Sequence, residues 1–339
     1  MERHRDLALG TLAQPVADDH AVRRVLPGVE IRLSDAGHIL GASIVELWLT
    51  EKGLTRKLVF SGDLGFRGAP VMPDPATIRT ADLVLLESTY GDRNHRAAGE
   101  TLAELEGVFA AARKGRGNIV IPAFAVGRTQ DLLYLLAEHY DDWHIGKWRV
   151  FLDSPMAIEA TAAYARYRHL YDAALFAPGR SQPVLANLAM SRSSEDSMAI
   201  NRIESGAIVI AGSGMCTGGR IVHHLKYNLW RPECHVVMVG YQAQGTLGRR
   251  LVDGAEYVRI FGETIRVNAK VHTVGGLSAH ADQAGLLDWY GAFEARPPVC
   301  LVHGEAGPQT ALARALRDRF EAKVNVPEYG AKIDLARGP

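Results

Sequence analysis

Three absences narrow the class of protein. The 339 residues include only three cysteines, Cys216, Cys234 and Cys300, and no C-x-x-C pair, which indicates reduced thiols and a cytoplasmic protein. No apolar stretch reaches the roughly 18 residues of a membrane span, and residues 1–6 lack the apolar core of a signal peptide. The 38 basic residues balance 38 acidic ones, so a polyanion would have to bind at a local site rather than in a general positive field.

The composition is that of an ordinary globular protein, with 47% hydrophobic and 22% charged residues, and the length suits about two domains. Strand-like and helix-like segments alternate, which predicts an α/β fold. Helices intervene only from about residue 100, and no low-complexity linker divides the chain. We therefore predict a block at 95–270 inserted into an outer domain formed by 1–94 and 271–339. The expected strands cover 29–34, 43–50, 56–61, 82–87, 118–122, 149–153, 207–211, 235–240, 270–274 and 298–302, and the expected helices cover 101–112, 128–139, 159–171, 219–230, 282–293 and 308–320.

Three strand-like apolar runs end in side chains of the kind that bind metal ions. His38, Asp63 and His303 each follow such a run, and loops at strand ends can bring distant sequence positions together. Imidazole nitrogens and carboxylate oxygens are ligands that Zn²⁺ accepts, at about 2.0–2.2 Å. Glu87 and His280 also follow apolar runs. The five placements together predict one active site.

Each of these residues also has a simpler interpretation. Asp63 could be an ordinary turn residue, His303 could cap the next helix, and Glu87 could be a buried carboxylate that pairs with a nearby arginine. Joint occurrence favours the site, because each simpler interpretation would have to hold independently. The remaining histidines are interpreted as structural or surface residues: His4, His20, His95, His139, His144, His169, His223, His224, His235 and His272.

A glycine-rich loop at 211–220 lies between a predicted strand and a predicted helix. Glycines allow close backbone approach, and a helix N-terminus presents free N–H groups, so phosphate binding is one interpretation. A dinucleotide fingerprint would need glycine at Thr217 and an acidic residue near Gly240, and both are missing. A tight turn followed by a helix cap remains the alternative.

The motifs, in this order and at these spacings, resemble the β-CASP branch of the metallo-β-lactamase superfamily, which processes RNA. The matching segments are GHILG at 37–41, FSGD at 60–63, ESTYG at 87–91, PAFAVGR at 122–128, DSPM at 153–156, GSGM at 212–215, SAHAD at 278–282 and VHGE at 302–305. The resemblance implies an αββα metallo-β-lactamase sandwich, incomplete here, with an inserted α/β β-CASP domain.

The resemblance also implies functional roles. His38, Asp63 and His303 correspond to ligands of a two-zinc site bridged by Asp63, with His280 as general acid and Glu87 as the residue that orients it. The substrate would be single-stranded RNA. Its backbone would be held by residues of the insert and of the following loop: Ser213, Gly214, Thr217, Arg220, Arg128, Lys270 and Ser278.

The family's H-x-H-x-D-H signature is missing from the sequence. Its two histidine positions hold Pro15 and Ala17, and the one Asp-His pair is Asp19-His20. We therefore expect an N-terminally truncated protein that binds zinc poorly, cleaves no RNA alone, and exposes apolar surface that favours aggregation or a homodimer. The genomic sequence upstream of Met1 would test this expectation.

Two other functions are open at this stage. A pseudoenzyme that serves as a partner subunit in RNA processing would explain missing ligands, yet five site residues are retained. A small-molecule hydrolase of the same superfamily would not need an insert as large as 95–270.

Overall fold

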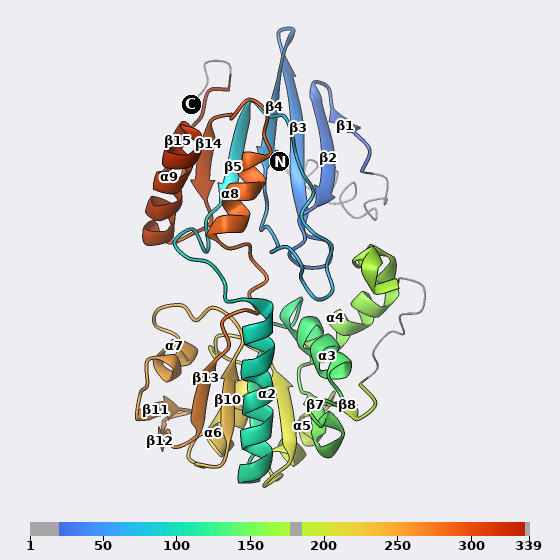
Figure 1. Cartoon of the computed structure of the whole chain (residues 1–339), viewed down its shortest axis with the longest axis vertical. Helices are drawn as coiled ribbons and strands as arrows, with labels where there is room; N and C mark the ends of the chain where they lie inside the picture. The colour runs from blue at the N-terminus through green and yellow to red at the C-terminus, as the bar shows by residue number, and fades with distance from the viewer. Residues whose placement is uncertain (1–19, 177–184, 336–339) are drawn as a thin grey trace, which may run out of the picture.

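The protein forms two lobes in a computed structural model that describes residues 20–176 and 185–335 (Figure 1). The upper lobe holds a seven-stranded sheet and the lower lobe a six-stranded sheet. Long helix α2 (Ala98–Gly115) marks the entry into the lower lobe, and β13 (Lys270–Thr273) is its last strand. Within the described residues, no helix is long and apolar enough to cross a membrane.

The upper sheet combines an antiparallel half with a parallel half, in the order β1-β2-β3-β4-β5-β14-β15. Neighbours from β1 to β4 are antiparallel, and β4, β5, β14 and β15 run parallel. Helices α8 (Gln283–Gly291) and α9 (Ala306–Phe320) pack on one face through a core that includes Tyr290 and Leu312. The strands are β1 (Arg23–Leu26), β2 (Val29–Asp35), β3 (Ser43–Glu51), β4 (Leu54–Phe60), β5 (Leu83–Glu87), β14 (Val299–Val302) and β15 (Val324–Asn325).

The lower sheet is parallel throughout and has helices on both faces. Its order is β13-β10-β6-β9-β7-β8. One core joins the sheet to α2, α3 and α4, and a second joins it to α6, α7 and the β11-β12 hairpin. The strands are β6 (Ile119–Pro122), β7 (Arg149–Leu152), β8 (Leu188–Met190), β9 (Ala207–Ala211), β10 (His235–Met238), β11 (Tyr257–Ile260) and β12 (Glu263–Arg266), and the helices are α3 (Arg128–Glu138), α4 (Pro155–Arg166), α5 (Ser194–Ile200), α6 (Arg220–Asn228) and α7 (Leu247–Val252).

The predicted α/β class is confirmed, and two details of the prediction need correction. The predicted boundary at 270 falls inside the lower lobe, because β13 pairs with β10. The helix predicted at 159–171 is α4, which starts earlier because Ser154 caps it and Pro155 fits its first turn. The described part of the upper lobe contains one sheet, in keeping with the prediction of an incomplete αββα sandwich. Short elements without a predicted counterpart are β1, β8, β11, β12, β15, α5 and α7, which carry too little periodicity to be recognised.

A histidine pair joins β10 to edge strand β13. His235 is fully buried, and its Nδ1 lies 2.9 Å from Nε2 of His272. Its own Nε2 has no hydrogen-bond partner among the described residues. Burial, with the nearby charges of His272 and Lys270, lowers the pKa of His235 to about 4. The folded protein therefore holds this imidazole neutral.

Acid should destabilise the protein through His235. Its folded pKa lies below the unfolded value of about 6.5, so this contribution is present above pH 6.5 and is lost as the pH falls towards 4. We expect the free energy of unfolding to drop by about 1–2 kcal/mol between pH 7.5 and pH 5, measured by urea denaturation. His235→Gln, which cannot take up this proton, should give a flatter profile. An equally steep profile would assign the acid sensitivity to other groups.

Candidate active site

The upper sheet brings four of the predicted residues to one edge. Strands β4, β5 and β14 run parallel, and β2 points the same way because both β2 and β4 are antiparallel to β3. His38, Asp63 and His303 follow the carboxyl ends of β2, β4 and β14, and Glu87 ends β5. His280 arrives from the loop between β13 and α8, where it pairs with Gly65 in an isolated β-bridge. Gly65 has no room for a side chain, since a Cβ atom there would lie 1.9 Å from the carbonyl oxygen of Gly37.

The five side chains meet, as the sequence predicts. His303 Nδ1 lies 3.3 Å from Asp63 Oδ1, and His280 Nδ1 lies 3.1 Å from Glu87 Oε1. The ring centroid of His280 is 4.3 Å from that of His38 and 5.7 Å from that of His303. One ligand atom each from His38, Asp63 and His280 fall within 4.8 Å of one another, and so do those of Glu87, His280 and His303.

Glu87 and His280 form a charged pair. Burial alone would raise the pKa of Glu87, but hydrogen bonds from His280, Thr89 N–H and Leu64 N–H outweigh it and hold that pKa below its ordinary value. Burial likewise opposes the charge on His280, while the hydrogen bond to Glu87 and the charges of Glu87 and Asp63 raise its pKa. The pair therefore keeps a proton on His280 at a pH where a free imidazole begins to lose it.

His38 carries the clearest sign that the cluster suits a metal. Its Nδ1 is buried and has no hydrogen-bond partner among the described residues. Burial and the charge of His280 lower the pKa of His38, so its imidazole stays neutral with a free lone pair. A neutral imidazole is the form that metals bind, and Asp63 and His303 add a carboxylate and a second imidazole. His38 and His303 fall in different groups of mutually close ligand atoms, while Asp63 lies near both, so the three residues fit parts of a two-metal site with Asp63 between the ions.

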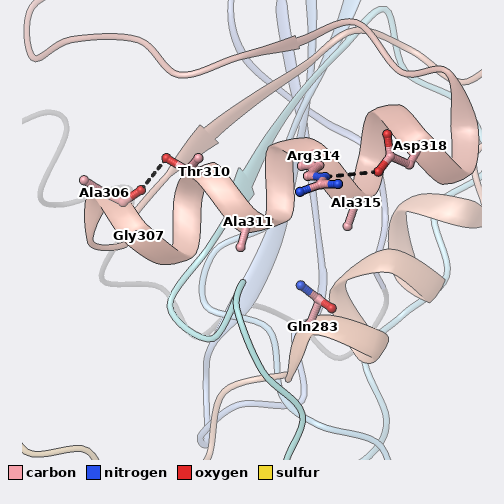
Figure 2. A pocket seen from close by; sticks show the side chains of 8 residues that line it. All are labelled: Gln283, Ala306, Gly307, Thr310, Ala311, Arg314, Ala315 and Asp318. Carbon is pink, nitrogen blue, oxygen red and sulfur yellow. Dashed lines mark hydrogen bonds and ion pairs between the residues drawn. The ribbon is translucent and has the colours of Figure 1, made fainter.

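The cluster faces solvent rather than an enclosed pocket. The side chains of Asp63 and His303 are 40% and 54% exposed. Two hollows elsewhere on the described part of the chain contain none of the predicted ligands. One hollow, of about 720 Å³, lies along α9 and the start of α8, near Gln283 (Figure 2). Its charged residues, Arg314 and Asp318, pair with each other at 3.5 Å.

Three of the residues predicted to bind RNA make other contacts in the structure, and a fourth, Lys270, lies away from the glycine-rich loop. Arg128 is only 4% exposed and pairs with Asp131 at 3.0 Å, so it cannot reach a phosphate. Arg220 donates to Asp153 and to the carbonyls of Ser191 and Arg192, which uses its guanidinium to hold the loop.

Lys270 starts β13, at the end of the parallel sheet opposite the glycine-rich loop. Ser278 is buried and accepts a hydrogen bond from His280 N–H at 3.3 Å, so it positions the His280 loop. Ser213, Gly214 and Thr217 lie in the loop between β9 and α6, and their phosphate contact stays a prediction.

The structure places two further residues at the site that were not among the predicted ones. His95, interpreted as structural, lies with its Nε2 2.8 Å from the carbonyl oxygen of His280. Thr89 Oγ1 lies 3.2 Å from Nδ1 of His303. Thr89 follows Glu87 at the end of β5, which is a usable signal. His95 lies in a loop without periodicity, and nothing in the sequence links it to His280.

Asp153 should be one of the most important residues for stability. It is fully buried and accepts hydrogen bonds from Arg220 Nη1 at 2.7 Å, His224 Nε2 at 2.6 Å and Ser197 Oγ at 2.6 Å. Asp153→Ala leaves the Arg220 charge uncompensated and should lower the free energy of unfolding by about 3–5 kcal/mol. Urea denaturation measures this loss. The control is Glu159, an exposed carboxylate that pairs with Arg192. Glu159→Ala should cost under about 1 kcal/mol. Similar costs for both variants would contradict the assignment.

Comparison with known proteins agrees with the geometry. Residues 129–251 match the family model of the Beta-Casp domain, and residues 264–327 match that of the Zn-dependent metallo-hydrolase RNA specificity domain. The chain is 40% identical over 313 residues to ribonuclease TTHA0252 of Thermus thermophilus, covering 91% of this chain and 70% of that protein. It is 34% identical over 327 residues to transcription termination factor FttA of Thermococcus kodakarensis, but spans only 49% of that protein's length. The chain belongs to the β-CASP family of zinc-dependent ribonucleases with a metallo-β-lactamase fold.

Proposed function

We propose that this chain carries part of the catalytic site of a zinc-dependent hydrolase that cuts single-stranded RNA. The observation that carries the proposal is the meeting of three metal-type ligands with the buried Glu87–His280 pair. The family comparison does not favour the alternatives, a partner pseudoenzyme or a small-molecule hydrolase.

The roles of the residues follow from their chemistry. His38, Asp63 and His303 would hold zinc, which when bound supplies an acidified water and a Lewis acid for phosphoryl oxygens. Glu87 accepts a hydrogen bond from Nδ1–H of His280. The Nε2–H of the charged imidazole is then the proton that can be given to the substrate. Donation of that proton to the leaving ribose oxygen is general acid catalysis.

We base the preference for single-stranded over double-stranded RNA on an exposed aromatic side chain beside the glycine-rich loop. Phe124, 42% exposed, lies at the carboxyl end of β6 and would contact any side chain placed at Gly214. An exposed aromatic ring next to a loop of backbone N–H groups can stack an unpaired base, whereas a paired base has no free face.

RNA cleavage assays test the proposal most directly in an extended protein, meaning this chain joined to an upstream segment with the H-x-H-x-D-H signature. A labelled single strand should be cut in a zinc-dependent manner, and the same RNA as a duplex should resist. Hydrolysis of lactams or thioesters without cleavage of RNA would refute the proposal.

We also propose that the 339-residue chain self-associates through the face of the upper sheet opposite α8 and α9. Side chains on that face are apolar yet partly exposed, among them Ile31, Leu33, Val45 and Leu47, while Phe60 is 38% exposed. Such a patch favours a homodimer or aggregation. Light scattering should find a species larger than the monomer, and Leu47→Glu should shift it to the monomer. A monomeric parent chain would contradict this.

A further inference from the structure

A second hollow lies on the lower lobe, beside the glycine-rich loop. It measures about 590 Å³ and opens between that loop, the start of α6, the start of α7 and the β11-β12 hairpin. Its lining includes Arg220, Arg259 and His223 and no acidic residue. Arg220 is already paired with Asp153, so Arg259 supplies the positive charge that suits the hollow to an anion, although the chain as a whole carries no net charge. A pocket of this size lies in the range of small-molecule sites.

An aromatic surface borders the hollow. Phe261 sits at the tip of the hairpin, is 58% exposed, and lies 4.5 Å from the ring of His223 at an interplanar angle of 32°. Its backbone φ of 49° lies in the region that favours glycine, so a bulky residue at this turn is unfavourable. Core packing does not account for it, because Val258 and Ile260 fill the core from the same hairpin. An aromatic ring held open in this way can stack against another flat ring.

Hydrogen-bond donors lie on the other side of the hollow. Backbone N–H groups of Gly218, Gly219 and Arg220, at the entry to α6, have no acceptor among the described residues. Gly218 is also open, with no atom within 4 Å of where a Cβ would stand. Arg259 donates through Nε to the carbonyl of Gly262 at 3.3 Å and forms no ion pair among the described residues. Its remaining N–H groups can face a phosphate.

We propose that this hollow binds one nucleotide unit, with the base stacked on Phe261 and the phosphate held by Arg259 and the N–H groups that open α6. The ligand is a stretch of single-stranded RNA that continues away from the reaction site, so this inference rests on the proposed function. The six lower strands are parallel, and their carboxyl ends share the edge from which residues 274–280 reach the upper lobe. The glycine-rich loop follows β9 at that same edge and lines the hollow, so an RNA strand that leaves the site along this edge would meet the hollow.

Nucleic acid fits the hollow better than a protein partner does. An open ring and a set of unpaired anion donors on facing walls match the two halves of a nucleotide. Stacking and phosphate contact read no sequence, so the site would hold any RNA and lengthen the bound footprint. A free nucleoside monophosphate shares this chemistry and must be distinguished by experiment.

Binding of RNA by the 339-residue chain tests the proposal without requiring catalysis. A fluorescent 20-nucleotide single strand is titrated at low salt and followed by anisotropy, with uridine monophosphate as competitor. Phe261→Ala should weaken binding roughly 5- to 100-fold, and Phe261→Trp should restore most of it. Gly218→Asp, which introduces a negative charge without a clash, should weaken binding as well. The matched control is Tyr257→Ala, which removes a 50%-exposed ring of the same hairpin outside the hollow and should have no effect.

Three other results of this experiment would each contradict a different part of the proposal. Unchanged binding by both Phe261→Ala and Gly218→Asp would overturn the nucleotide site while leaving the proposed function intact. Full competition by micromolar uridine monophosphate would identify a free nucleotide as the ligand and overturn the RNA path. Absence of RNA binding by the unaltered chain, with self-association lost in Phe261→Ala, would show that the surface contacts a protein instead.

Discussion

Replacing His280 by alanine in the extended protein should lower RNA cleavage by about 10²–10⁴-fold and leave the zinc content unchanged. The reason is geometric. His280 donates to a fully buried Glu87, and this pair raises the pKa of His280 so that the proton is retained for the leaving oxygen. Turnover is measured on a labelled single strand and zinc by elemental analysis. Loss of zinc would instead make His280 a ligand, a role that its proximity to His38 and Asp63 allows.

A companion variant separates the acid from the residue that orients it. Glu87→Gln keeps the size of the side chain but removes the charge that raises the pKa of His280. Because a general acid must be protonated, the alkaline limb of the pH–rate profile should move to lower pH in this variant. A variant with reduced activity but an unmoved limb would indicate that Glu87 acts only as a structural residue.

Much of the site could be predicted from the sequence because strand ends impose proximity. His38, Asp63, Glu87 and His303 end or follow apolar runs, and strands of one sheet that point the same way bring such positions to one edge. Local patterns are therefore enough to place Glu87 beside His303, although more than 200 residues separate them in the chain.

The predictions that failed depend on pairing between distant residues. Arg220 is held by Asp153, and β13 joins the lower sheet by pairing with β10, relations that no local pattern encodes. Arg128 is a different case. Its partner Asp131 lies three residues away on α3, a spacing at which side chains of a helix meet. This ion pair could therefore have been predicted from the sequence. A basic residue should be counted as an RNA contact only after its nearest acidic neighbour has been considered.

The 339-residue chain by itself should bind zinc weakly and at less than one ion per chain, and it should cleave RNA no faster than background. His38, Asp63 and His303 do not fall in one group of mutually close ligand atoms, so an ion held by them has fewer than the three or four protein ligands that zinc sites normally take. Two of the three side chains are substantially exposed, which leaves a bound ion open to water and chelators. Elemental analysis after dialysis against a weak chelator measures the content, and a nuclease assay measures the activity.

Paired variants make this last expectation specific to the cluster. His38→Ala and His303→Ala should each remove the residual zinc, because either change leaves one histidine and one carboxylate, too few to compete with water. His144→Ala is the control, since His144 is exposed on the lower lobe outside the ligand cluster. Stoichiometric zinc together with robust cleavage by the 339-residue chain would mean that other side chains complete the site. The search would then start with His280 and Glu87, whose ligand atoms already lie within 4.8 Å of that of His303.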